Sequence, residues 1–425
     1  MYLSSIDRPS VDDPPPADRS RLRGLTVVGG NVFALGTVSL LTDISAEMVT
    51  AILPVYLVFG LSMSPLAYGV IDGLYTGATA LLRLVGGYVA DRIRTPKAVA
   101  GIGYAMSALA KLGLLAVGRS TGAIGLVLAV DRAGKGLRTA PRDALITLSA
   151  PPKVLARAFG VHRAMDGFGA FLGPIVALAV LAATGQAIDA VLFTSFCIAA
   201  LGVLVLVLFV RGRHDERPPA AAVSLREALT LLKAAPVRRL LIAACVLGFA
   251  VIGDGFVYLL LQRREELSIG SFPLLAVGTS LAYLLLAIPI GALADRIGRP
   301  AVVLGGYAAL VVVYLLLFGP LRGWPLLALV LLLYGLFYAA TDGVLMALAG
   351  PVLPEHLRTT GIALIQTGQA LAYLVSSVLF GVAWQLWGPV TASRCAAAVA
   401  VLAVVATAFL LINRSTTTTD TEVTV

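Results

Sequence analysis

Two acidic residues are one helical turn apart in the first long apolar stretch of the chain. Asp43 and Glu47 are separated by three residues, so they share one face of a helix. A charge inside hydrocarbon costs about 2.5–3.5 kcal/mol on insertion scales and therefore needs a partner or a cavity. Like charges in a low dielectric favour retention of a proton by one of them. We therefore expect a proton-binding or substrate-binding role; the alternative is that Asp43 only pairs with Arg132 or Lys135 to hold two helices together.

Further charged residues lie inside apolar stretches, mostly in the first half of the chain. Arg132 directly follows Asp131, and because neighbours on a helix do not share a face, we expect them to make different contacts. Asp166 follows His162 by four residues and Arg163 by three, which favours a local ion pair. The candidate proton-coupling residues are Asp43, Glu47, Arg132 and Asp166. The candidate substrate-cavity residues are Asp72, Lys135, Tyr258, Asp254, Asp342, Gln366 and Gln369.

The composition indicates what kind of structure must position these residues. Of 425 residues, 59% are hydrophobic and 13% are charged, whereas globular domains have about 45–50% and roughly 25%. This argues against water-soluble enzymes and nucleic-acid-binding proteins. Twelve apolar runs are each long enough to cross about 30 Å of hydrocarbon as a helix, so the sequence predicts an all-α membrane protein with twelve transmembrane helices. The expected spans cover residues 27–60, 65–90, 97–118, 121–145, 157–183, 187–211, 238–261, 270–294, 300–319, 324–349, 358–384 and 388–412.

The net charge of +9 indicates orientation rather than nucleic-acid binding. Most of the 32 Lys and Arg residues fall in the two tails and in alternate loops, which is the positive-inside pattern. We therefore expect a multi-pass protein of the cell membrane with both termini cytoplasmic. The expected parts are a tail (1–26), a six-helix bundle (27–211), a cytoplasmic loop (212–237), a second six-helix bundle (238–412) and a tail (413–425).

An internal repeat relates the two predicted bundles. A Gly-x-x-x-Asp-Arg pattern follows the second span and recurs after the eighth, and Arg-x-x-Gly opens both the fifth and the eleventh. Such matches at equivalent places indicate a duplicated six-helix unit. The residues of the first pattern and its extension are Gly87, Asp91, Arg92, Gly291, Asp295, Arg296 and Arg299.

These patterns resemble motifs of the major facilitator superfamily. The repeated pattern resembles motif A, the segment from Arg132 to Lys135 is similar to motif B, and Gly169, Gly173 and Pro174 resemble the motif C of antiporters. The resemblance implies two pseudo-symmetric six-helix bundles that rock around a midplane site. It implies a cytoplasmic gate at motif A and a cavity-lining arginine in motif B. Close helix packing would by itself explain the motif C residues.

The resemblance implies a secondary active transporter, not an enzyme. The charges of the first half favour proton coupling, and the partial motif C favours efflux of a drug-like or metabolite substrate by antiport. The alternatives are proton-coupled uptake of a nutrient or siderophore-like solute, and translocation of lysophospholipids or other lipids. The sequence has no P-loop and no metal-ligand spacing, so we expect no cofactor and no metal. The expected partners are a small molecule, protons and the bilayer, with no nucleic acid, and we expect a monomer.

Overall fold

The computed structural model describes residues 29–77, 79, 95–118, 120–151, 154–212, 230–341, 348–349, 352–354 and 358–412. Every regular element in these ranges is a helix. The first half contains α2 (Gly30–Val55), a π-helical turn η1 (Tyr56–Gly60), helical residues 65–77, α4 (Pro96–Ala116), α5 (Thr121–Ser149), α6 (Leu155–Ala183) and α7 (Ile188–Phe209). The second half contains η3 (Leu231–Lys233), α9 (Ala235–Phe249), α10 (Asp254–Glu265), η4 (Ile269–Ser271), α11 (Pro273–Ile297), α12 (Arg299–Leu316), α13 (Gly323–Thr341) and α15 (Arg358–Ile412).

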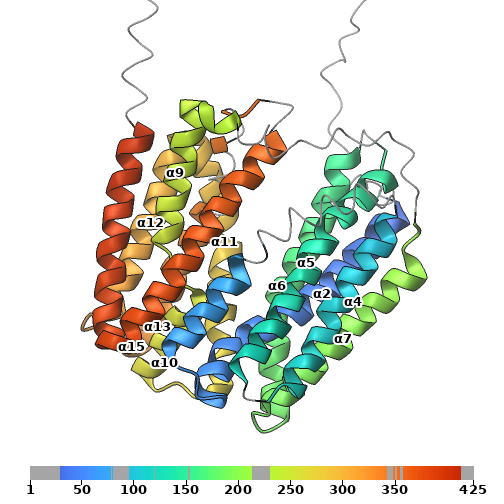
Figure 1. Cartoon of the computed structure of the whole chain (residues 1–425), viewed down its shortest axis with the longest axis horizontal. Coiled ribbons are helices and arrows are strands. Elements are labelled where there is room, and N and C mark those ends of the chain that lie inside the picture. Colours follow the sequence, from blue (N-terminus) through green and yellow to red (C-terminus); the bar gives the residue numbers. More distant parts are fainter. Residues whose placement is uncertain are drawn as a thin grey trace, which may run out of the picture.

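Nine helical stretches in the described part of the chain are long and apolar enough to cross a membrane. One of them, Gly361–Leu410, turns back at Gly388, where φ is +83°, and therefore makes two crossings (Figure 1). The other two expected spans do not meet the criterion, because α5 carries several charges and residues 65–77 are too few. The chain is an all-helical multi-pass membrane protein.

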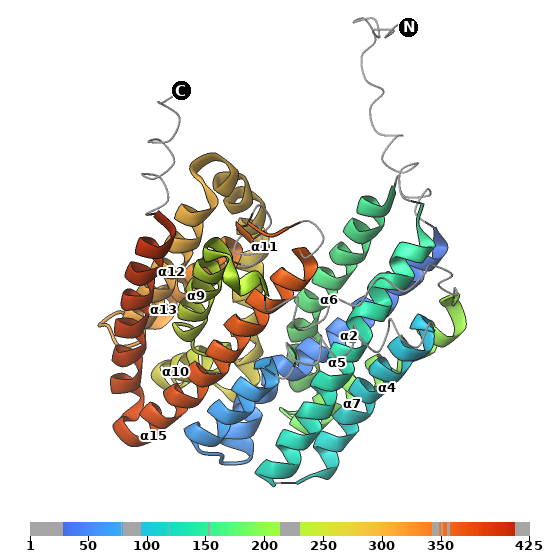
Figure 2. The same ribbon diagram turned by 45° about the horizontal axis from the view of Figure 1, so that its top comes forward.

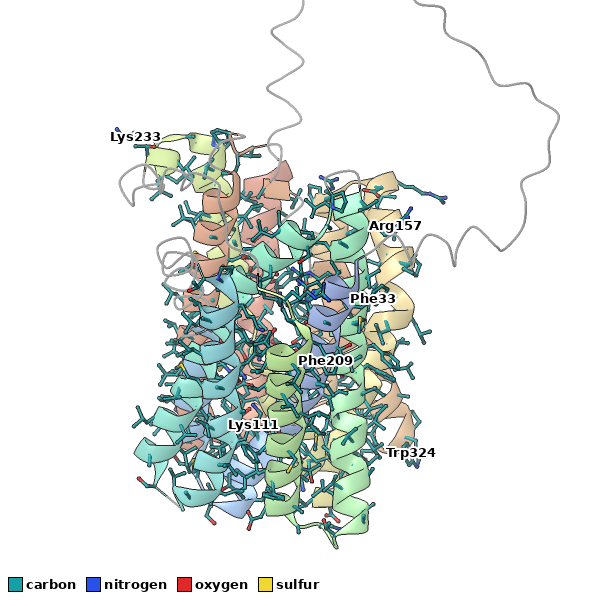
Figure 3. All side chains as sticks on the ribbon, turned by 90° about the vertical axis from the view of Figure 1, so that its right-hand side faces the viewer. Phe33, Lys111, Arg157, Phe209, Lys233 and Trp324 are labelled. Atoms are coloured by element: carbon teal, nitrogen blue, oxygen red, sulfur yellow. The ribbon has the colours of Figure 1, made fainter. Side chains whose placement is uncertain are left out.

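The helices form two groups that follow the two halves of the sequence. In the first group α2 packs against α6 and α7, and α4 packs against α5; in the second, α9 packs against α15 and α13 against α11 and α12. Figures 1 and 2 show the groups side by side, with the start of α2 and the end of α15 at the same end of the molecule. Arg157 and Lys233 lie near that end, whereas Trp324 lies near the opposite one (Figure 3).

Small residues let the two groups meet closely. A Cβ added at Gly73 would lie 2.9 Å from the carbonyl oxygen of Leu374 on α15, and one at Gly69 would lie 2.5 Å from that of Ser377. Glycine at these positions allows two helix backbones to approach each other. On the other side of the interface α6 contacts α11.

The expected span 238–261 is interrupted in the structure. α9 ends at Phe249 and α10 begins at Asp254, with Gly253 in an extended conformation. The hydroxyl of Tyr314 accepts a hydrogen bond from the Ile252 amide at 2.9 Å and lies 3.2 Å from the Ala250 carbonyl, to which it donates. The Tyr314 side chain therefore makes hydrogen bonds to backbone groups that the break leaves without helical partners. Buried backbone N–H and C=O groups need such partners. The break places Asp254 in the first turn of a helix.

Candidate functional site

A cavity of about 570 Å³ lies between the two groups of helices. Its volume is within the range of about 300–1,000 Å³ that is typical of small-molecule sites. The described lining combines acidic side chains with hydroxyl groups and aromatic rings. The acids are Glu47, Asp72 and Asp254, and the tyrosines are Tyr68, Tyr75, Tyr258, Tyr283, Tyr338 and Tyr373.

Asp254 is held at the second-half wall of the cavity. Its carboxylate accepts hydrogen bonds from the hydroxyls of Tyr334, at 2.8 Å, and Tyr338. The amide groups at the start of α10 add a favourable helix-dipole interaction. Tyr258, one turn further along α10, also lines the cavity. Both residues were expected in the cavity from the sequence, whereas the two tyrosines of α13 were not.

Asp72 connects the two halves of the chain. Its Oδ2 accepts hydrogen bonds from Tyr373 at 2.9 Å and from Ser377 at 2.7 Å, both on α15. Gly253 also packs on it, since an added Cβ there would overlap the Asp72 carboxylate. Asp72 therefore lies directly beside the residue that precedes Asp254, which places two acids from opposite halves at one level of the cavity.

Glu47 faces the cavity. Among the described residues, no hydrogen bond or ion pair involves its carboxylate. Lys135 and Arg132 are the cations whose charges act on it most strongly. Gly173 of α6 packs against this residue, because an added Cβ would lie 2.6 Å from the Glu47 Cβ. The motif C-like glycine thus brings α6 against the helix turn that carries Glu47.

Asp43 lies near Arg138 rather than near the partners considered from the sequence. It is 3.7 Å from Arg138, and it is close enough to the Asp166 carboxyl group for their charges to interact. In the described part of the structure, neither Arg132 nor Lys135 is within ion-pair distance of it. Asp43 is therefore part of a cluster between α2, α5 and α6.

The local ion pair expected for Asp166 is wrong. Its carboxylate is 3.7 Å from Arg142 of α5, whereas Arg163 is exposed. Arg142 also donates to Ser39 at 3.2 Å, and the Ser39 hydroxyl is 3.0 Å from Nε2 of the fully buried His162. The long side chain of Arg142 therefore reaches Asp166 from the neighbouring helix, which spacing along α6 alone does not reveal.

The expectation that Asp131 and Arg132 make different contacts is also wrong. Arg132 Nε donates to Asp131 Oδ2 at 3.1 Å, and Lys111 is 3.3 Å from Oδ1, which also accepts from Ser107. The long arginine side chain folds back on its neighbour, which the helix-face argument ignores. The Arg132 guanidinium also lies 3.7 Å above the ring centre of Tyr75, a cation–π contact behind the cavity wall.

Other candidate residues lie away from the cavity. Gln369 contacts α9, where an added Cβ on Gly248 would be 2.5 Å from its carbonyl oxygen. Gln366 is half-buried one turn earlier and is not among the lining residues. Lys135 is half-buried on α5, close enough to Asp43 and Glu47 for its charge to act on both.

The motif residues fall in three places. Gly169 and Gly173 pack on α2, and Pro174 lines the cavity. At the end of α11, Asp295 is 3.9 Å from Arg299 and largely exposed; Arg296 is exposed, and an added Cβ on Gly291 would meet open space. The remaining candidates lie outside the described residues: Gly87, Asp91, Arg92 and Asp342.

Known proteins share this sequence pattern and fold. The family model of the Major Facilitator Superfamily matches residues 35–275 and 260–424. The chain is 30% identical over 363 residues to an uncharacterized MFS-type transporter of Methanocaldococcus jannaschii, which covers 84% of this chain and 89% of that protein. The fold is similar to that of a mutant of the nucleoside transporter NupG, with a TM-score of 0.77 at 16% identity over 90% of this chain and 100% of that one. The fold is also similar to that of a POT family transporter in complex with 5-aminolevulinic acid. The TM-score is 0.74 at 14% identity, over 92% of this chain and 98% of that one.

Proposed function

The chain belongs to the major facilitator superfamily, and from this premise we propose that it is a proton-coupled secondary transporter that exports a small organic solute. Membership makes the chain a transporter of small molecules rather than an enzyme. The ion, the direction and the class of solute are the proposed parts.

The cluster that contains Asp43 and Asp166 carries the proposal of proton coupling. Two carboxyl groups that act on each other as like charges in a low dielectric favour retention of a proton by one of them. Asp43 of α2 is 3.7 Å from Arg138 and Asp166 of α6 is 3.7 Å from Arg142, and the two acids are close enough for their charges to interact. Glu47 is one turn from Asp43 and faces the cavity, so a proton can pass between this cluster and the solute site.

Transport then follows the alternating-access scheme. We take residues 27–211 and 238–412 as two bundles that rock about the cavity, which both of them line. Arg157 and Lys233 lie at the end where the described chain begins and ends (Figure 3), which supports a cytoplasmic location of that end and insertion in the cell membrane. The motif C-like Gly169 and Gly173, packed between α6 and α2, support export.

Everted membrane vesicles with a fluorescent pH probe test the coupling. After respiration sets up a proton gradient, lipophilic cations, antibiotics, sugars and organic acids are added singly. We expect one class to reduce the gradient with the wild type but not with Asp43→Asn or Asp166→Asn. Asp189→Asn, at an exposed position of α7, should match the wild type.

Two results would count against this function. If Asp43→Asn moves protons as the wild type does, the carboxyl pair has no coupling role. If no solute releases the gradient although the wild type is correctly inserted, proton antiport is wrong. Accumulation in intact cells separates the directions, because an exporter lowers the level of the solute and an importer raises it.

A further inference from the structure

We propose that the cavity binds an organic cation, with an ammonium or quaternary ammonium group on an apolar body. The inference rests on the proposed function in one respect, because it takes the cavity between the halves as the solute site. It adds a charge and a chemical class, which membership in the family leaves open.

The acids of the cavity define its charge preference. Glu47, Asp72 and Asp254 all line it, and carboxylates in a low-dielectric cleft attract cations and repel anions. Hydroxyls of Tyr373 and Ser377 lie against the Asp72 carboxylate, and those of Tyr334 and Tyr338 lie against that of Asp254. Hydrogen-bond donors at a carboxylate stabilise its ionised form.

The position of these acids would favour a positively charged group bound between the two halves. Asp72 belongs to the first half and lies against Gly253, the residue before Asp254 of the second half. The two carboxylates act on each other as like charges. A bound cation would relieve this repulsion and would touch both bundles at once, which a solute must do if its binding is to influence their movement.

The tyrosines supply the second part of the site. Six tyrosine rings line the cavity, and tyrosine faces attract ammonium groups by cation–π interaction, strongest for groups removed from water. The Arg132 guanidinium already makes such a contact with Tyr75, 3.7 Å from the ring centre, and its charge is balanced by Asp131. Rings and carboxylates together suit a cation that also carries apolar surface, rather than a small metal ion.

Binding to the purified full-length protein tests the inference with three probes of one shape. Benzyltrimethylammonium, benzyl alcohol and benzoate have similar bodies and carry one positive charge, no charge and one negative charge. Calorimetric titration should give saturable binding of the cation and at least tenfold weaker binding of the other two. Asp254→Asn and Glu47→Gln should each weaken binding of the cation at least tenfold, whereas Asp189→Asn should leave it unchanged.

The variants differ in structural risk. Asp254→Asn alters hydrogen bonds to two tyrosines, whereas the Glu47 carboxylate has no such bond among the described residues. Glu47→Gln therefore tests the charge even if Asp254→Asn fails to fold, and thermal melting of each variant shows which case holds. Equal binding of the three probes, or absence of saturable binding of the cation to folded wild-type protein, would overturn the inference.

Reconstitution separates this inference from the proposed function. If proteoliposomes transport the cation without moving protons, proton coupling fails and the cation class stands. If protons move only with a neutral or anionic solute, the coupling stands and the cation class fails.

Discussion

Ser377 donates a hydrogen bond to Asp72 at 2.7 Å, although the two residues lie 305 positions apart in the sequence. Tyr373, one turn earlier on α15, donates to the same oxygen. Both donors lie on the leg of α15 that runs towards its turn at Gly388. These bonds join the halves of the transporter on the cavity wall, which Asp72 and Tyr373 both line.

Removal of the Ser377 hydroxyl should let the halves separate more easily. A hydrogen bond to a charged group contributes about 1.5–3 kcal/mol, so Ser377→Ala should shift the opening equilibrium about tenfold or more. The measurement is the rate at which a membrane-impermeant maleimide labels the cysteine of a Thr50→Cys variant, since Thr50 lines the cavity. The native cysteines are removed from this protein beforehand. Ser393→Ala, which removes a bond to Pro389 within α15, is the matched control. Equal labelling rates in both variants would show that Ser377 does not hold the halves together.

Gly173 should not tolerate a methyl group. An added Cβ would lie 2.6 Å from the Glu47 Cβ, 2.8 Å from the Ile44 carbonyl oxygen and 3.0 Å from the Met48 amide nitrogen. Backbone atoms cannot move aside, so Gly173→Ala should lower stability by about 1–3 kcal/mol and reduce transport. Melting of the purified protein measures this.

Gly167→Ala on the same helix is the control, since nothing lies within 4 Å of its added Cβ. That change should be neutral or slightly stabilising, because alanine favours helix more than glycine does. A similar loss in both variants would mean that close packing on Glu47 is not the cause.

Asp131 should be essential for folding because it balances two buried cations. Lys111 is 2% exposed and Arg132 is 4% exposed, and both contact its carboxylate. Asp131→Asn leaves both charges uncompensated, which should cost about 3–5 kcal/mol and reduce the yield of monodisperse protein. Lys111→Met leaves Asp131 paired with Arg132 alone, so it should lower stability and yield less than Asp131→Asn does. Size-exclusion profiles and melting temperatures measure the difference. A greater loss with Lys111→Met would contradict this account of the cluster.

Arg264 should fix the connection between α12 and α13. Its guanidinium donates to the carbonyls of Leu316 at 2.7 Å, Leu321 at 2.6 Å and Gly319. A lysine ammonium cannot reproduce the planar donor fork, so Arg264→Lys should cost about 1–3 kcal/mol through unpaired carbonyls.

The readout for Arg264→Lys is the melting temperature, together with proteolysis between α12 and α13. Arg322→Lys, at an exposed position of the same connection, should behave as the wild type. Equal melting and cleavage of both variants would show that the three carbonyl bonds are dispensable.

Much of the fold follows from the sequence alone. Apolar runs of membrane-spanning length dictate helices, since backbone groups in lipid must be satisfied within their own segment. The cost of charge in hydrocarbon identified Glu47, Asp72 and Asp254 as residues that require a partner or a cavity, and in the structure all three line the cavity. The break before α10 was missed, although Gly253-Asp254-Gly255 is a local signal of weak helix propensity.

Only the tertiary structure decided which charges pair and what surrounds the acids. Asp166 of α6 pairs with Arg142 of α5, and the Arg132 side chain folds back on Asp131. The donors to Asp72 come from α15, near the other end of the chain. Sequence spacing describes one helix at a time, whereas partners between helices depend on helix tilt, on rotation and on how far a flexible side chain reaches. The burial of charge is therefore readable from composition, but its compensation is a property of the packed bundle.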